Sequence, residues 1–210
     1  MPNFIGDSIN TIPAIELIRQ VFPQARITLL GPSFLKELFE YDPRISYIIV
    51  SNKRKKNYFR NIFVISRSRY DLGILFTNTF MTALLLRLAL VKRLVGYENE
   101  GRGFLLNFKR PLNRNVHYIN RYAMLVNEWL GNKFTCLPTL KLYYKQECNF
   151  HFANNNPVMG LYLGGTNKRF RRYPEEQAIV LLRMLRNYNL VFIGDSNDAV
   201  VQSSYVRQAM

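Results

Sequence analysis

Pro2-Asn3-Phe4-Ile5-Gly6-Asp7-Ser8 opens the chain and decides how its first half is expected to fold. Gly6 lets the backbone approach a ligand closely or take a positive φ, and Asp7 and Ser8 are residue types that favour the start of a helix. Apolar residues then recur at three- and four-residue steps from Ile9 to Phe22, which is typical of a helix with one buried face. The stretch predicts a tight turn that delivers the Asp7 carboxylate to the carboxyl edge of an α/β sheet, where ligands bind.

Two simpler interpretations of this stretch stay open. Asp7 could only cap the helix, because helix caps are far commoner than catalytic acids. Pro13 has no backbone N–H to donate inside a helix, so it predicts either a later helix start or a kink. Spacing alone does not separate a capping carboxylate from a catalytic one.

The composition is that of a strongly basic globular protein. Of the 210 residues, 48% are hydrophobic and 20% are charged, which excludes a disordered chain. The 29 Lys and Arg residues against 14 Asp and Glu give a net charge of +15, which predicts anionic partners such as nucleic acid, anionic lipid or phosphorylated ligands. Two cysteines and two histidines make neither a disulfide framework nor a metal cluster. No apolar run reaches the roughly 18 residues of a membrane span, and no signal peptide is visible, so we expect a cytoplasmic protein that can lie on a membrane surface.

Strand and helix patterns alternate along the rest of the chain. Strands are expected at 25–30, 45–50, 70–76, 93–97 and 140–144, and helices at 33–39, 53–65, 80–90 and 115–130. This order is typical of parallel βαβ units. The stretch Asn154-Asn155-Asn156-Pro157 predicts a linker, and a strand at 158–163, a helix from Pro174 and a strand at 190–193 predict a second α/β unit. We therefore expect an α/β fold with domains at 1–153 and 154–210.

The stretch Lys53-Arg54-Lys55-Lys56 opens one of these helices, in which aromatic residues are interleaved. A solvated loop is the simplest interpretation of such a charge run. Contact with anionic lipid is a more specific interpretation, since each cation near an acidic membrane contributes about 1 kcal/mol to the binding free energy. Stacking on single-stranded nucleic acid is a third, although no motif of a specific nucleic-acid-binding module is present.

A second basic stretch, Gly164-Gly165-Thr166-Asn167-Lys168-Arg169-Phe170-Arg171-Arg172, lies between an expected strand and the helix that Pro174 begins. Glycines leave backbone N–H groups free to approach an anion, and the hydroxyl and the cations add further donors. The stretch predicts a phosphate site or, equally simply, a basic surface loop. It is no Walker loop, because it lacks Gly-Lys-Ser/Thr.

Three passages resemble glycosyltransferase family 9, the ADP-heptose lipopolysaccharide heptosyltransferases, and are most like the heptosyltransferase II subgroup. They are Ile5-Gly6-Asp7-Ser8-Ile9-Asn10-Thr11-Ile12-Pro13-Ala14, the Tyr70-Asp71 strand with its Asn78-Thr79-Phe80 turn, and Gly96-Tyr97-Glu98-Asn99-Glu100-Gly101-Arg102-Gly103-Phe104-Leu105-Leu106. The resemblance implies a GT-B-type α/β fold, with a Rossmann-like N-terminal domain and the first part of a second one. The family's first strand and its Asp-Ser/Thr-Gly-x-x-His motif are missing, so we expect a chain truncated at both ends.

The resemblance also implies roles for single residues. Asp7 would be the general base. The donor-binding residues would be Thr166, Lys168, Arg171 and Arg172, and the acceptor-binding residues Asn78, Glu100, Arg102 and His117. For His117 a surface or capping role is the simpler interpretation.

The implied reaction is an inverting transfer of heptose from ADP-heptose to the anionic lipid A-core acceptor. No Asp-x-Asp pair occurs in the sequence, so we expect no metal, and no cofactor is implied. The basic segment at 53–56 would contact the inner-membrane surface from the cytoplasmic side. The alternative is a truncated, inactive fragment that binds acceptor or nucleotide only.

Overall fold

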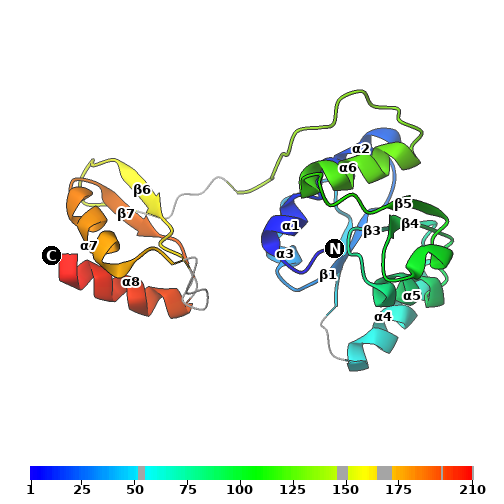
Figure 1. The fold of residues 1–210 in the computed structure, drawn as a ribbon, viewed down its shortest axis with the longest axis horizontal. Helices are drawn as coiled ribbons and strands as arrows, with labels where there is room; N and C mark the ends of the chain where they lie inside the picture. Colours follow the sequence, from blue (N-terminus) through cyan, green and yellow to red (C-terminus); the bar gives the residue numbers. More distant parts are fainter. Residues whose placement is uncertain (52–54, 146–150, 165–171, 195, 210) are drawn as a thin grey trace. The chain divides into compact units, whose positions relative to one another are not determined.

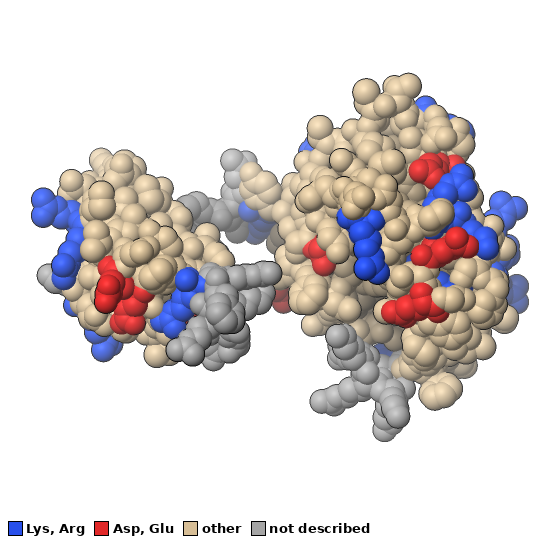
Figure 2. Space-filling model, viewed as in Figure 1, with Lys and Arg blue, Asp and Glu red and all other residues tan. Residues whose placement is uncertain are grey.

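The computed structural model describes residues 1–51, 55–145, 151–164, 172–194 and 196–209, without the side chains of residues 55–57, 196 and 197. These residues belong to two compact units, 1–146 and 147–210 (Figure 1 and Figure 2). The domain division at residues 153 and 154 stays a prediction. No helix in the described part of the chain is long and apolar enough to cross a membrane.

The strands of unit 1 form two sheets, and every strand pairing within them is parallel. Strand β1 (Thr28–Gly31) pairs with β2 (Tyr47–Val50), and β3 (Leu72–Leu75), β4 (Arg93–Glu98) and β5 (Phe108–Pro111) form a sheet in the order β3-β4-β5. The Tyr70 hydroxyl, just before β3, donates to Thr28 Oγ1 of β1 at 3.0 Å and joins the two sets of strands. Because parallel strands end at one edge of a sheet, the loops that carry polar residues gather there.

Helices cover both faces of these strands (Figure 1). The helices of unit 1 are α1 (Ile5–Ile9), α2 (Ile12–Val21), α3 (Leu35–Leu38), α4 (Lys55–Ser68), α5 (Phe80–Leu88), the 3₁₀ helix η1 (Arg102–Leu105) and α6 (Tyr118–Trp129). Helices α2 and α6 pack together through a core that includes Leu17, Tyr122 and Val126. Helices α4 and α5 bury Ile65 and Ala83 against the opposite face.

Unit 2 is smaller and has its own core. Strands β6 (Val158–Leu161) and β7 (Asn189–Phe192) pair in parallel, and helices α7 (Glu175–Met184) and α8 (Ser196–Ala209) pack together. The buried residues Leu163, Ala178, Leu182 and Tyr205 form this core. Unit 2 therefore has the strand–helix–strand–helix order of an α/β unit.

The opening stretch differs from its expected form in two ways. Helix α1 begins at Ile5 with Phe4 as its N-cap, so Asp7 lies inside this helix and does not cap one. Gly6 lies in the same helix and has no positive φ. Helix α2 begins at Ile12 and places Pro13 in its first turn, where a missing N–H costs nothing. The later helix start is thereby confirmed, and a kink is not required.

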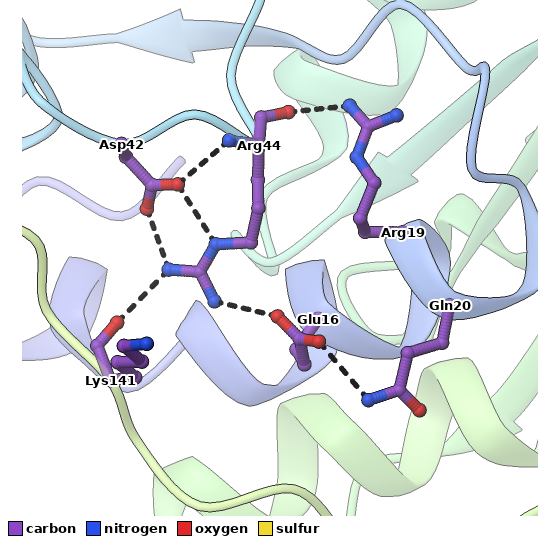
Figure 3. A network of polar contacts seen from close by, with 6 residues as sticks. All are labelled: Glu16, Arg19, Gln20, Asp42, Arg44 and Lys141. Atoms are coloured by element: carbon purple, nitrogen blue, oxygen red, sulfur yellow. Dashed lines mark hydrogen bonds and ion pairs between the residues drawn. The ribbon is translucent and has the colours of Figure 1, made fainter.

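The strand expected at 140–144 is wrong, and the reason is a buried arginine. Arg44 donates through Nη2 to the carbonyl of Lys141 at 3.0 Å, so this segment runs along a side chain and not along a strand (Figure 3). The same guanidinium donates to Asp42 Oδ1 and Oδ2 at 2.8 and 2.6 Å and to Glu16 Oε2 at 3.0 Å. Burial alone would lower the pKa of Arg44, but these bonds raise it above its ordinary value.

We expect Arg44→Ala to lower the free energy of unfolding of the chain by about 3 to 5 kcal/mol, because among the described residues it leaves the charge of the buried Asp42 carboxylate unpaired, with only the backbone N–H of residue 44 donating to its Oδ1. The side chains of Arg44 and Asp42 are only 5% and 1% exposed. Urea denaturation measures the change. The exposed Lys92–Asp71 pair is the matched control, and Lys92→Ala should leave the midpoint unchanged. Equal effects of the two substitutions would contradict the assigned importance of the buried network.

Candidate functional site

Arg102 ties together two loops at the carboxyl edge of the sheet. Its side chain is completely buried, and Nη1 donates to the carbonyls of Thr77 and Thr79, which follow β3, at 2.6 and 3.2 Å. Its Nε donates to the carbonyl of Tyr97 in β4 at 2.9 Å, and Nη2 lies 3.4 Å from Asn78 Oδ1. Burial lowers the pKa of Arg102 to about 10. In this structure the residue therefore holds the loops, and its acceptor-binding role stays a prediction.

Glu100 fixes the start of α5 from the neighbouring loop. Its Oε2 accepts the backbone N–H of Phe80 at 2.9 Å, where a carboxylate is favourable because the amino end of a helix carries partial positive charge. Glu100 and Gly101 both have positive φ, 48° and 70°, which turns the chain sharply between β4 and η1. Asn78, Glu100 and Arg102 thus lie in neighbouring loops that hydrogen bonds hold together. Binding of an acceptor by these three residues stays a prediction.

The Asp7 carboxylate lies near the aromatic side chain of Tyr122 on α6. Burial and, as a smaller contribution, the negative charge of Asp7 raise the pKa of the Tyr122 hydroxyl to about 12. The Tyr122 ring packs edge-on against Phe76 at 5.1 Å and lies 6.0 Å from the Tyr118 ring. Sequence reasoning identified Tyr122 only as a buried residue of this helix. Its spacing of four from Tyr118 was the available signal that both face the same way.

His117 is the N-cap of α6. Its Nδ1 accepts the backbone N–H of Ile119 at 3.4 Å, and its ring is exposed. This contact matches the capping interpretation of the residue. Binding of an acceptor by His117 stays a prediction.

Of the four expected donor-binding residues, the structure describes one. Thr166, Lys168 and Arg171 lie outside the described residues. Arg172 is half-buried in unit 2, where its Nη2 donates to the hydroxyl of Tyr205 and its guanidinium carbon lies 5.3 Å from that ring. Tyr205 belongs to α8, a helix that the polar sequence did not predict. Among the described residues, no three of His, Cys, Asp and Glu lie close enough to hold a metal ion.

Comparison with known proteins identifies the family to which these two units belong. Residues 62–209 match the pattern of glycosyltransferase family 9 (heptosyltransferase), which is more than half of the chain. The chain belongs to glycosyltransferase family 9. This match includes η1, α6 and all of unit 2 except its last residue.

Several family 9 relatives are similar over nearly the whole chain. Lipopolysaccharide heptosyltransferase 2 of Escherichia coli is 22% identical, covering 94% of this chain and 62% of its own length. Lipooligosaccharide heptosyltransferase 2 of Haemophilus ducreyi is 21% identical, covering 95% of this chain and 63% of its own length. The chain therefore spans about three fifths of the length of these curated relatives.

Solved structures of family 9 proteins confirm the fold class. The E. coli ADP-heptose lipopolysaccharide heptosyltransferase II matches with a TM-score of 0.81 at 20% identity, over 99% of this chain and 68% of that one. The E. coli heptosyltransferase WaaC with ADP matches with a TM-score of 0.72 at 14% identity, over 98% of this chain and 70% of that one. The GT-B-type α/β fold expected from the sequence is confirmed.

We expect Arg102→Ala to loosen the carboxyl edge, because at least three backbone carbonyls, two in the loop after β3 and one in β4, lose their donor. The free energy of unfolding should fall by about 3 kcal/mol. Amide hydrogen exchange should accelerate at residues 77–80 and 102–106 before it does so in α2 or α6. Lys109→Ala, which removes an exposed ion pair with Glu98, is the control and should change neither quantity. Uniform acceleration across unit 1 would show that Arg102 supports the whole core and not these loops.

Proposed function

We propose that this chain is the transferase part of a heptosyltransferase of the heptosyltransferase II type, which moves heptose from ADP-heptose to the inner core of lipopolysaccharide. The observation that carries the proposal is the position of Asp7. This carboxylate is half-buried at the carboxyl edge of a parallel sheet, beside Tyr122, in a family 9 chain. Ligands bind at this edge in α/β folds.

The chemistry requires one base and one site that stabilises a leaving group. The Asp7 carboxylate takes the proton of the acceptor hydroxyl, whose oxygen attacks the anomeric carbon from the face opposite the diphosphate. The bond from that carbon to the diphosphate breaks, so ADP leaves and the configuration inverts. In the described part of the chain nothing hydrogen-bonds the Asp7 carboxylate. Its oxygen lone pairs are therefore available for a proton.

Positive charge has to stabilise the departing diphosphate. We assign this role to Thr166, Lys168, Arg171 and Arg172, with no metal ion and no cofactor. The absence of an Asp-x-Asp pair in the sequence supports a metal-independent transfer. Tyr205 supports the assignment of Arg172, because it holds the guanidinium at the end of the basic stretch.

The acceptor in this proposal is an anionic lipid, so the enzyme acts at the cytoplasmic face of the inner membrane. The net charge of +15 favours association with such a surface. The basic segment at 53–56 is the expected contact, although its side chains lie outside the described residues.

Asp7→Asn keeps the size of the side chain and removes the base. We expect the transfer rate to fall by about 100- to 10,000-fold, while the affinity for ADP stays near that of the unmodified chain. Release of ADP and mass spectrometry of the acceptor measure transfer. Glu37→Gln is the matched control. It also replaces a carboxylate by an amide, at an exposed site of α3, and should retain full activity. Normal turnover of Asp7→Asn would remove this residue from the mechanism.

Arg172→Ala should weaken ADP binding by about tenfold or more, because a charge-assisted hydrogen bond to the diphosphate is lost. Calorimetric titration of the full chain with ADP measures this, and Arg186→Ala, on an exposed site of unit 2, is the control. A greater loss of acceptor binding than of ADP binding would place Arg172 outside the donor site. ADP binding without any transfer would favour the alternative of a binding-only chain.

A further inference from the structure

Four large apolar side chains of unit 1 are exposed to solvent on neighbouring elements. Phe59 and Phe63 of α4 are 76% and 56% exposed, Met81 of α5 is 52% exposed, and Phe104 of η1 is 75% exposed. We call these four residues the apolar rim. Single exposed apolar residues are ordinary in proteins, but a contiguous group indicates an interaction surface.

Two contacts show that the three elements of the rim adjoin one another. The Tyr58 hydroxyl of α4 donates to the carbonyl of Met81 in α5 at 3.1 Å. The rings of Phe80 and Phe104, in α5 and η1, lie 6.1 Å apart. Helices α4 and α5 also run beside each other in the ribbon (Figure 1).

The rim lies at the same edge of the sheet as Asp7. Met81 is the second residue of α5, which follows β3, and Phe104 lies in η1, which follows β4. The segment that enters α4 likewise follows β2. Because β3 and β4 are parallel, their carboxyl ends share one edge, which Met81 and Phe104 border. The hydrogen bond from Tyr58 to the carbonyl of Met81 places the start of α4 beside them.

The structure holds the rim outward and does not bury it elsewhere. Helix α4 packs on the core through Ile65, Ile62 and Tyr58, which leaves Phe59 and Phe63 on another face. Arg102 and Glu100 fix η1 and the start of α5 by the hydrogen bonds described above. The exposure of the rim is therefore a feature of well-anchored elements.

The charges around the rim favour an anionic partner. Among the described side chains of α4, Arg60 and Arg67 are cations and none is acidic. The guanidinium carbon of Arg67 lies 4.2 Å from the centre of the Phe63 ring. Glu100 is an acid near the rim, and its Oε2 already accepts from Phe80. A helix that combines exposed aromatic residues with cations is typical of elements that lie in the interface of an anionic bilayer.

We propose that the apolar rim inserts into the headgroup layer of an anionic bilayer and so presents the Asp7 edge to a lipid-borne acceptor. The second half of this statement rests on the proposed function, and the first half does not. The cations of α4 attract the surface, and the four apolar side chains leave water on contact.

Co-sedimentation with vesicles tests the insertion. The full chain should bind vesicles of phosphatidylethanolamine with phosphatidylglycerol and bind poorly to pure phosphatidylcholine. The double substitution Phe59→Ser with Phe63→Ser should weaken binding by about tenfold or more, and Phe104→Ser alone should weaken it less. Leu88→Ser, at the far end of α5 where Leu88 is 51% exposed, is the matched control and should bind normally. All variants should melt at the temperature of the unmodified chain, since the exchanged side chains are exposed.

Three results would overturn the proposal. Vesicle binding by the double variant at the level of the unmodified chain would show attraction by charge alone. Equal loss with Leu88→Ser would show that any exposed apolar residue matters. Sedimentation of the unmodified chain as a dimer that the double variant loses would assign the rim to a second copy.

A transfer assay separates this proposal from the proposed function. With a water-soluble acceptor fragment, the rim variants should transfer at the normal rate, whereas with acceptor in vesicles their rate should fall. Vesicle binding that depends on the rim, in a chain with no transfer to either acceptor, would leave the rim in place and refute only the transferase.

Discussion

The buried charge of Arg102 is the constraint on which the carboxyl edge depends. A guanidinium removed from water is costly unless its donors are satisfied. Among the described residues no carboxylate pairs with it directly, and backbone carbonyls of Thr77, Thr79 and Tyr97 accept its hydrogen bonds instead. The loops after β3 and β4 can therefore hardly move apart, because separation would leave both the charge and the carbonyls unsatisfied. Arg102 and the bond from the Phe80 N–H to Glu100 together set the positions of η1 and of the start of α5.

Asp7 is positioned by hydrogen bonds of its neighbouring residues, which leave its own carboxylate without a hydrogen bond to any described residue. Beside it, the buried Ser8 hydroxyl donates to the carbonyl of Pro2 at 3.4 Å, and Thr11 Oγ1 donates to the carbonyl of Ser8 at 2.7 Å. These bonds anchor the short helix α1 through its neighbours and not through the acid. A carboxylate that capped a helix would have used its lone pairs on backbone N–H groups. The sequence left open that Asp7 caps a helix, and the structure does not place it there. This difference matters for the chemistry, since a general base needs free lone pairs to accept a proton.

The sequence predicted most elements because their apolar runs are bounded by turn residues, as in β3 and α5. It missed β5, since Phe-Lys-Arg-Pro shows no strand pattern and only pairing with β4 defines it. It missed α8 because that helix is largely polar, and it mistook 140–144 for a strand because the partner of that segment, Arg44, is distant in sequence. The sequence around Arg102 is compatible both with an arginine that binds a ligand and with one that binds backbone carbonyls. Only burial separates these two cases, and no local pattern encodes burial.

Charge and apolar surface have to act together if the chain is to stay on a membrane. Cations alone give weak attachment that salt disrupts, and a few exposed aromatic residues alone bind reversibly. Helix α4 carries both, and η1 adds Phe104 from the far side of α5. Because Arg102 sets the position of η1, the residue that shapes the loops near Asp7 also orients part of the surface proposed to meet lipid. Docking and catalysis would then share one rigid edge, so an acceptor held in the bilayer would arrive where the base already lies.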